Sequence, residues 1–193
     1  MKERHDRILS SGLIKFDENN NAYSVPFDWN KMVEKTKEEL HLMQEAYADV
    51  GLYIDKESTI YAIPCGWDRI TQKAVNTAEV DLLFVIRQPY SDDELETFLL
   101  NAMDNCYKKE REPGLGPLEK HFGVKSWVKA VEGLKFISFS WVKKEGYNFI
   151  PSTKTPRKGY NHPQEDEWIC IGTNPQKGAL AKAFHKALGE STC

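Results

Sequence analysis

The sequence predicts an α+β fold: a mixed or largely antiparallel β-sheet with helices packed against it. Three observations predict this fold. Apolar residues recur at helical spacing in two well-marked segments, near 95–106 and 180–188. Short apolar runs bounded by turn residues, such as Thr59–Ile63, indicate strands. The order of these elements along the chain favours a sheet covered by helices.

Length and composition indicate one ordinary domain over residues 1–193. The chain has 193 residues, of which 40% are hydrophobic and 11% aromatic, enough to fill a core. The loop 112–117 is a candidate subdomain boundary, although it is too short for a flexible linker. The net charge of -3 argues against a dedicated nucleic-acid binder, which is usually basic.

No segment is predicted to cross a membrane. The longest apolar run, Val80–Ile86, is interrupted by a charge, whereas a spanning helix needs roughly 20 apolar residues. Residues 1–7 are charged and lack the apolar core of a signal peptide. A cytoplasmic location is therefore the expectation.

The first third of the chain predicts a hairpin and a helix. Short strands near 13–16 and 22–25 flank the polar turn 17–21. Beyond it, Asp28 resembles an N-cap, and apolar residues recur at helical spacing as far as Val50. We therefore expect a helix over about 28–49, which Gly51 ends.

The next segments predict two strands and the clearest helix. A strand over 59–63 is followed by a longer one over 79–88, which Pro89 stops. Ser91 and Glu94 then form a capping box, in which each side chain satisfies a backbone amide of the other residue. The apolar face of the helix that follows consists of Leu95, Phe98, Leu99, Ala102, Met103 and Cys106.

The C-terminal half predicts a helix, a hairpin, a strand and a final helix. The segments are a helix over 118–131, a hairpin of strands 134–144 and 147–152, a polar loop over 153–166 and a strand over 168–171. For the final helix, Asn174 is the expected cap and Pro175 the first helical residue. Leu180 and Phe184 belong to its apolar face, and Gly189 is expected to end it.

No motif for catalysis, metal binding or cofactor binding is present. Glu165, Asp166 and Glu167 are adjacent, and adjacent carboxylates rarely converge on one substrate atom. His162 has no second histidine nearby, so a metal site there is not expected. The four cysteines are far apart and form no Cys-x-x-Cys pair, which favours reduced thiols: Cys65, Cys106, Cys170 and Cys193. We predict no catalytic residue, no metal and no cofactor.

Charged residues form three surface clusters. Asp92 and Asp93 belong to an acidic run that also contains Glu94, Glu96 and Asp104, and residues 165–167 form another. Together they could steer a basic protein partner by long-range attraction. A basic cluster with interleaved aromatic residues occupies 143–158 and gives a nucleic-acid alternative; its members are Lys143, Lys144, Lys154, Arg157 and Lys158.

The C-terminal part resembles the immunity proteins of bacterial contact-dependent growth inhibition systems. The resemblance is carried by four segments in this order: 120–126 (KHFGVKS), the hairpin 134–151, the strand 168–171 and 178–184 (GALAKAF). The turn into a helix at 91–95 (SDDEL) is also similar to a segment that those proteins use. The match covers about residues 118–188.

This resemblance implies a cytoplasmic, non-enzymatic protein that binds and neutralises the C-terminal domain of a cognate toxin, often a nuclease. The candidate partner-binding residues are Glu165, Asp166, Glu167, Trp168, Asp92 and Asp93. Two alternatives stay open. One is an enzyme whose site is assembled from distant residues such as Cys65, His121 or His162, and the other is a nucleic-acid-associated protein that uses the 143–158 cluster. Nothing in the sequence identifies a small-molecule ligand.

Overall fold

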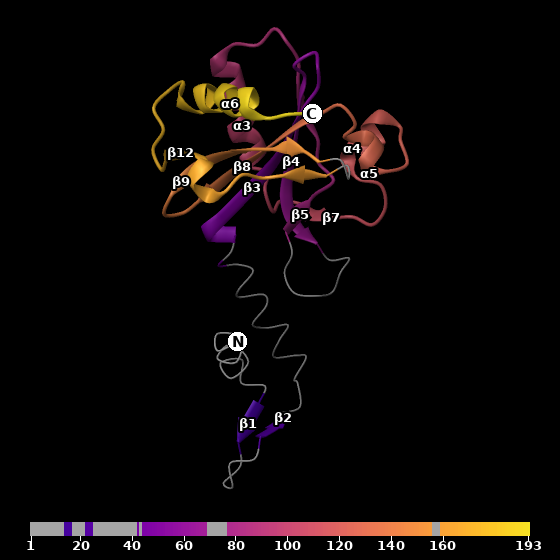
Figure 1. Cartoon of the computed structure of the whole chain (residues 1–193), viewed down its shortest axis with the longest axis vertical. Helices are drawn as coiled ribbons and strands as arrows, with labels where there is room; N and C mark the ends of the chain where they lie inside the picture. Colours follow the sequence, from indigo (N-terminus) through magenta and orange to yellow (C-terminus); the bar gives the residue numbers. More distant parts are fainter. Residues whose placement is uncertain (1–13, 17–21, 25–41, 43, 69–76, 156–158) are drawn as a thin grey trace. The chain divides into compact units, whose positions relative to one another are not determined.

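The structure is a computed structural model that describes residues 14–16, 22–24, 42, 44–68, 77–155 and 159–193 (Figure 1). The chain forms two compact units, Met1–Glu39 and Leu40–Cys193. In the first unit, β1 (Ile14–Phe16) pairs antiparallel with β2 (Ala22–Ser24), which confirms the predicted hairpin. The predicted turn at 17–21 lies outside the described residues. The loop 112–117 lies within the second unit, and one domain over 1–193 stays a prediction.

The second unit is built on a sheet of eight strands, ordered β12-β9-β8-β3-β4-β5, with β6 and β7 also pairing with β4. All its strand pairs are antiparallel except β4–β7. This confirms the predicted mixed, largely antiparallel sheet. The strands are β3 (Tyr47–Ile54), β4 (Ile60–Asp68), β5 (Thr77–Glu79), β6 (Phe84–Ile86), β7 (Glu110–Arg111), β8 (Lys135–Val142), β9 (Gly146–Pro151) and β12 (Ile169–Gly172). A separate pair joins β10 (Thr153–Lys154) to β11 (Tyr160–Asn161).

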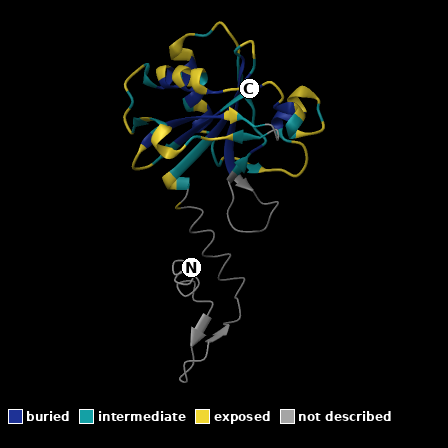
Figure 2. Ribbon diagram, viewed as in Figure 1, coloured by how far each residue is buried: buried dark blue, intermediate teal, exposed yellow. Residues whose placement is uncertain are grey.

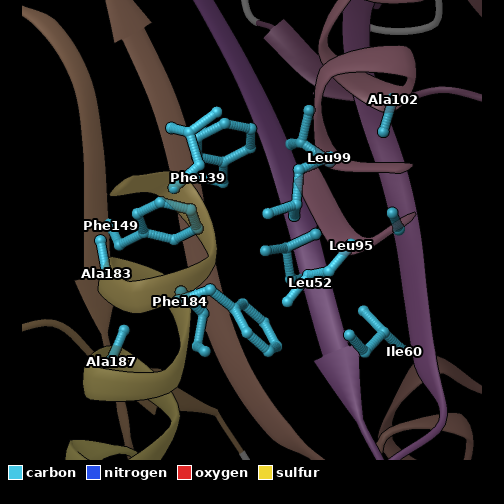
Figure 3. Close-up of a cluster of buried hydrophobic side chains, with 14 of the residues drawn as sticks. Leu52, Ile60, Leu95, Leu99, Ala102, Phe139, Phe149, Ala183, Phe184 and Ala187 are labelled. Atoms are coloured by element: carbon cyan, nitrogen blue, oxygen red, sulfur yellow. The ribbon is translucent and has the colours of Figure 1, made fainter. Parts of the chain in front are cut away.

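Two long helices cover one face of this sheet. They are α3 (Asp92–Met103) and α6 (Ala179–Glu190), seen together on the same side in Figure 1. Because strand side chains alternate between faces, Leu52 of β3, Phe139 of β8 and Phe149 of β9 all point into this layer. Figure 3 shows these side chains against Leu95 and Phe184 from the two helices. The α+β fold with helices packed on the sheet is therefore confirmed.

Two short helices cover part of the opposite face. They are α4 (Pro117–Phe122) and α5 (Trp127–Ala130). A second, smaller apolar cluster lies beneath them and joins Tyr53, Tyr61 and Ile63 of the sheet to Leu118 and Val131. Figure 2 shows the buried residues along the strands and the exposed ones on the outer sides of the helices. In the described part of the chain, no helix is long and apolar enough to cross a membrane.

The helix predicted over 28–49 is wrong at its C-terminal end. Residues 47–49 begin β3, and Gly51 lies in the middle of that strand. The reason lies in tertiary contacts, because β3 pairs with β4 on one side and β8 on the other. Val50, Leu52 and Ile54 belong to the core under α3 and α6, and Tyr53 belongs to the cluster on the opposite face, which is the two-residue period of a strand. Residues 42 and 44–46 are helical, as predicted, and residues 25–41 and 43 lie outside the described part.

Three other boundaries also differ from the sequence predictions. The strand expected over 79–88 is two short strands, β5 and β6, which pair with different parts of β4. The helix expected over 118–131 is two helices, because Gly123 adopts a left-handed conformation (φ 66°) and ends α4. The loop expected over 153–166 contains the β10–β11 pair and a 3-10 helix, η1 (Glu165–Glu167).

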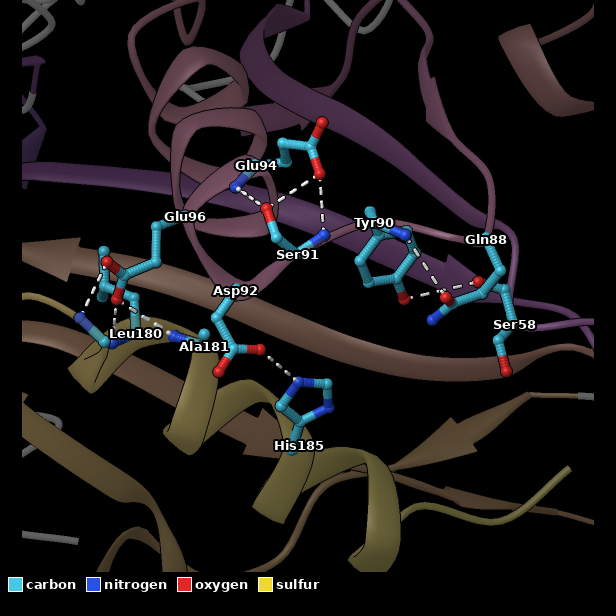
Figure 4. A network of polar contacts seen from close by, with 11 residues as sticks. Ser58, Gln88, Tyr90, Ser91, Asp92, Glu94, Glu96, Leu180, Ala181 and His185 are labelled. Carbon is cyan, nitrogen blue, oxygen red and sulfur yellow. Dashed lines mark hydrogen bonds and ion pairs between the residues drawn. The ribbon is translucent and has the colours of Figure 1, made fainter.

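The final helix begins later than predicted. It starts at Ala179 after Gly178 (φ 85°), not at Asn174 and Pro175, and it runs one residue past Gly189. Its first amides are capped by Glu96 of α3. Carboxylate oxygens of Glu96 accept hydrogen bonds from the amides of Gly178 (2.9 Å), Leu180 (2.8 Å) and Ala181 (3.2 Å). Figure 4 shows this carboxylate between the two helices, beside the confirmed Ser91–Glu94 capping box.

We expect Glu96→Ala to lower the free energy of unfolding by roughly 1–3 kcal/mol, because it leaves helix-terminal amides without their acceptor. Urea denaturation of the wild type and the variant measures this loss. Glu145→Ala, at an exposed position in the β8–β9 turn, is the control and is expected to change stability by less than about 0.5 kcal/mol. Equal midpoints for Glu96→Ala and the wild type would contradict the capping role.

Candidate functional site

The predicted acidic segment 165–167 lies at the edge of a hollow in the surface. Residues 165–167 form η1, between β11 and β12, and all three side chains are exposed. Asp166 and Glu167 line a hollow of about 550 Å³ together with Trp168. Lys186 and Glu190 of α6 and Pro151 at the end of β9 also line it. We call η1, Glu165–Glu167, the acidic rim and this cavity the acidic hollow.

The acidic rim carries negative charge that the described part of the chain leaves unneutralised. Among the described residues, none forms an ion pair with Glu165, Asp166 or Glu167. Lys186, across the hollow, lies 3.9 Å from Glu190 of its own helix. The rim is therefore free to meet a positively charged group from outside.

Trp168 follows the rim directly and lines the same hollow. Its side chain is partly buried, and its indole Nε1 is buried with no hydrogen-bond partner in the described part of the chain. A buried donor without a partner costs about 1–3 kcal/mol. The three acids and Trp168, grouped by the sequence prediction, are thus together at one site.

Asp92 and Asp93 lie elsewhere, at the start of α3, and each has a partner on or next to α6. Asp93 forms an ion pair of 2.6 Å with Lys177. Asp92 lies 3.3 Å from the imidazole of His185, which offsets its charge only when protonated (Figure 4). These acids join the two helices, so they present less free charge than the acidic rim. Their role in partner binding stays a prediction.

The structure places Cys65, His121 and His162 in different surroundings. The Cys65 thiol lies 3.7 Å from the carboxylate of Asp49, and burial, followed by that nearby charge, raises its pKa well above the ordinary value. A thiol held protonated in this way is a poor nucleophile. The His121 ring packs on Tyr61 (5.3 Å between centroids). The ring of His162 packs on Phe136 at 5.7 Å.

Lys154, at the centre of the basic 143–158 cluster, is engaged in local structure. Its ammonium donates to the carbonyl of Val131 at 2.9 Å and lies 4.1 Å from the centre of the Tyr160 ring. Lys143 lies 3.9 Å from Glu45. Arg157 and Lys158 fall outside the described residues. The described residues of this cluster therefore form no open basic groove that would support the nucleic-acid alternative.

Sequence reasoning missed a group of polar residues on the face of the sheet opposite α3 and α6. Asp49 of β3 accepts a hydrogen bond from the Ser138 hydroxyl at 2.7 Å. Glu79 of β5 accepts one from the Tyr53 hydroxyl at 2.6 Å. Burial raises the pKa of Asp49 above its ordinary value and that of Glu79 to about 7. No local pattern marks either residue, because strand pairing alone brings them to this face.

These features define an α+β protein with an acidic hollow at its surface. In the described residues, no group of three or more His, Cys, Asp or Glu side chains could hold a metal ion. No protein-family model and no curated protein matches the sequence. Among solved structures, the chain is similar to a protein of unknown function from Neisseria meningitidis, NMB0488, at 10% identity with a TM-score of 0.56. The match covers 77% of this chain and 97% of the other, and at this identity it shows the fold alone.

Proposed function

We propose that this chain is a binding protein that neutralises a cognate toxin domain in the bacterial cytoplasm, in the manner of the immunity proteins that its C-terminal segments resemble. The observation that carries the proposal is the acidic rim: three exposed carboxylates without ion-pair partners in the described part of the chain, set beside a hollow of about 550 Å³. The partner is the C-terminal domain of the toxin, and no cofactor or membrane takes part.

The charge of the rim suits a basic partner. A toxin domain that acts on nucleic acid must hold phosphates, and its binding surface is therefore positive. An acidic surface opposite such a domain raises the rate of encounter and fixes its orientation. Occupation of the toxin's phosphate-binding surface by the rim would block its access to nucleic acid.

The acidic hollow supplies what an interface needs beyond charge. Binding energy concentrates in a few residues, often Trp, Tyr or Arg, that lie centrally in well-packed pockets. Trp168 lines the hollow beside the rim, and its side chain is partly buried. We therefore assign Trp168 as the central contact and the rim acids as the steering charges around it.

A growth assay tests the proposal. The C-terminal domain of the large protein encoded immediately upstream is expressed with and without this chain. Growth arrest without the chain and recovery with it, together with a stoichiometric complex on purification, is the expected result. A harmless upstream product, or arrest that this chain does not relieve, would refute the proposal.

Charge reversal of the rim is expected to slow association. The triple variant Glu165→Lys, Asp166→Lys and Glu167→Lys should lower the association rate with the toxin domain by roughly 10- to 1000-fold at low salt, because it replaces attraction by repulsion. Surface plasmon resonance at two salt concentrations measures this rate. A variant with the same charge change at exposed acids elsewhere, Glu57→Lys, Glu112→Lys and Glu145→Lys, is the control. Equal rates for the two triple variants would place the interface away from the rim.

A further inference from the structure

A second cavity, of about 310 Å³, is lined by residues of β5, β7 and the helices α4 and α5. Glu79 of β5 and Glu119 of α4 contribute carboxylates to its lining, and Trp127 of α5 contributes an indole. Leu118 adds an apolar wall, and Arg111 of β7 contributes a guanidinium at the exposed side. None of the residues singled out from the sequence belongs to this cavity.

Glu119 is the residue that points to a ligand. It is only 9% exposed, yet its carboxylate has no hydrogen bond or ion pair with any residue in the described part of the chain. The carboxylate lies over Gly116, where an added Cβ would come within 2.7 Å of Oε2. Most of this side chain is buried, whereas its carboxylate oxygens stay open to the cavity. A cation with N–H donors is the group that complements a carboxylate placed in this way.

The remaining charges of the cavity leave it negative. The Tyr53 hydroxyl donates to Oε1 of Glu79, which leaves further acceptor positions on that carboxylate. Asp81, also in the lining, is already paired with Lys120 at 2.6 Å. Arg111 supplies one positive charge against the carboxylates of Glu112 and Glu119. Glu79, whose pKa burial raises to about 7, adds only part of a negative charge at neutral pH. The net negative charge of the lining favours binding of one cation and disfavours binding of an anion.

We propose that this cavity binds a guanidinium group, as carried by an arginine side chain. A guanidinium is planar and offers several N–H donors in one plane, which suits carboxylates on neighbouring elements. Its face stacks on an aromatic ring, which Trp127 supplies, and its aliphatic stem would pack against Leu118. An ammonium is a compact charge. It cannot donate several hydrogen bonds in one plane, and it has no flat face to stack on the indole of Trp127. The site is distinct from the acidic rim, and its assignment does not depend on the toxin.

Methylguanidinium, its neutral isostere N-methylurea and butylammonium are the probes. Each is titrated into the full chain, and the indole resonance of Trp127, assigned with Trp127→Phe, is followed by nuclear magnetic resonance. A saturable shift with methylguanidinium, at least tenfold weaker binding of butylammonium and no shift with N-methylurea are expected. Equal binding of the neutral isostere or of butylammonium, or no saturable shift, would overturn the assignment.

Glu119→Gln sharpens the test, because it removes the charge and keeps the shape of the side chain. We expect it to weaken methylguanidinium binding at least tenfold. Glu132→Gln, at an exposed position outside the cavity, is the matched control and should bind as the wild type does. Unchanged binding in Glu119→Gln would refute the inference, and the probe series on the wild-type chain decides the matter even if this variant fails to fold. Failure of toxin neutralisation would leave these results unaffected, since they use the chain alone.

Discussion

Phe184→Ala is expected to lower the free energy of unfolding by about 3–5 kcal/mol, the usual cost of removing a buried phenyl ring from a packed core. Phe184 of α6 is fully buried, and its ring meets that of Phe149 edge-on, with centroids 6.3 Å apart. The Phe149 ring in turn stacks on Phe139 of β8 at 4.5 Å (Figure 3). The substitution would open a cavity between the helix layer and the sheet that these rigid neighbours cannot fill.

Urea denaturation measures this loss, and Phe122→Ala provides the matched control. Phe122 undergoes the same chemical change, but it lies at the end of α4 and is 38% exposed. Its ring contacts Tyr61 at 5.2 Å on the opposite face of the sheet, so a smaller loss is expected there. A loss for Phe184→Ala no greater than that for Phe122→Ala would show that the α6 layer does not hold the core together.

The sequence predicted well those elements whose caps, turns and apolar pattern lie within the element itself. The helix α3 carries its capping box and its apolar face within a dozen residues, and both are present as expected. The strands β8 and β9 are joined by a turn at Gly146, whose positive φ of 88° marks it as a turn position. Such elements need no information from distant parts of the chain.

The sequence predictions that failed concern elements that depend on residues far away in the chain. The start of α6 was misplaced because its cap comes from Glu96, which is 82 residues away from Gly178 in the chain. The strand β3 was expected to be the end of a helix because its apolar residues fit both periods, and only pairing with β4 and β8 selects the strand. Local propensity yields to tertiary contacts in both cases.

The candidate sites divide in the same way. The acidic rim and Trp168 are consecutive residues, so a run of charge was enough to single them out. The free charge of Asp92 and Asp93 was overestimated, because the residues that offset it belong to the distant 177–185 segment. The guanidinium cavity could not be predicted from the sequence, because Glu79 and Glu119 belong to a strand and a helix that come together only in the folded chain.

Glu79→Gln is expected to make the protein more stable than the wild type at pH 8 and to lose that advantage towards pH 4.5. Burial raises the pKa of Glu79 to about 7 in the folded chain, against an ordinary value of 4.5. The nearby carboxylates of Asp49 and Glu119 also raise this pKa, whereas the hydrogen bond from Tyr53 and the charge of Arg111 lower it. Folding therefore favours the protonated form of this side chain.

The sign of the effect follows from proton binding. Between pH 4.5 and 7 the folded state binds more protons at Glu79 than the unfolded state, so the stability that this group contributes below pH 4.5 is lost as the pH rises through 7. Glutamine is neutral throughout and removes that loss, which we expect to be roughly 3 kcal/mol at pH 8. Because the charges of Asp49 and Glu79 repel each other, the variant also relieves Asp49 of this repulsion, which adds to the gain in the same direction.

Urea denaturation at pH 5 and pH 8 of the wild type, Glu79→Gln and the exposed control Glu145→Gln measures this difference. The gain of Glu79→Gln over the wild type should grow with pH, while that of Glu145→Gln should stay within about 0.5 kcal/mol at both values. A gain that is the same at pH 5 and pH 8 would mean that Glu79 is ionised in the folded chain across this range. The carboxylate would then already have a cation or enough donors around it, and the cavity would offer less to an entering guanidinium. The pH dependence of this one glutamate thus tests both the electrostatics of the fold and the ligand that we assign to it.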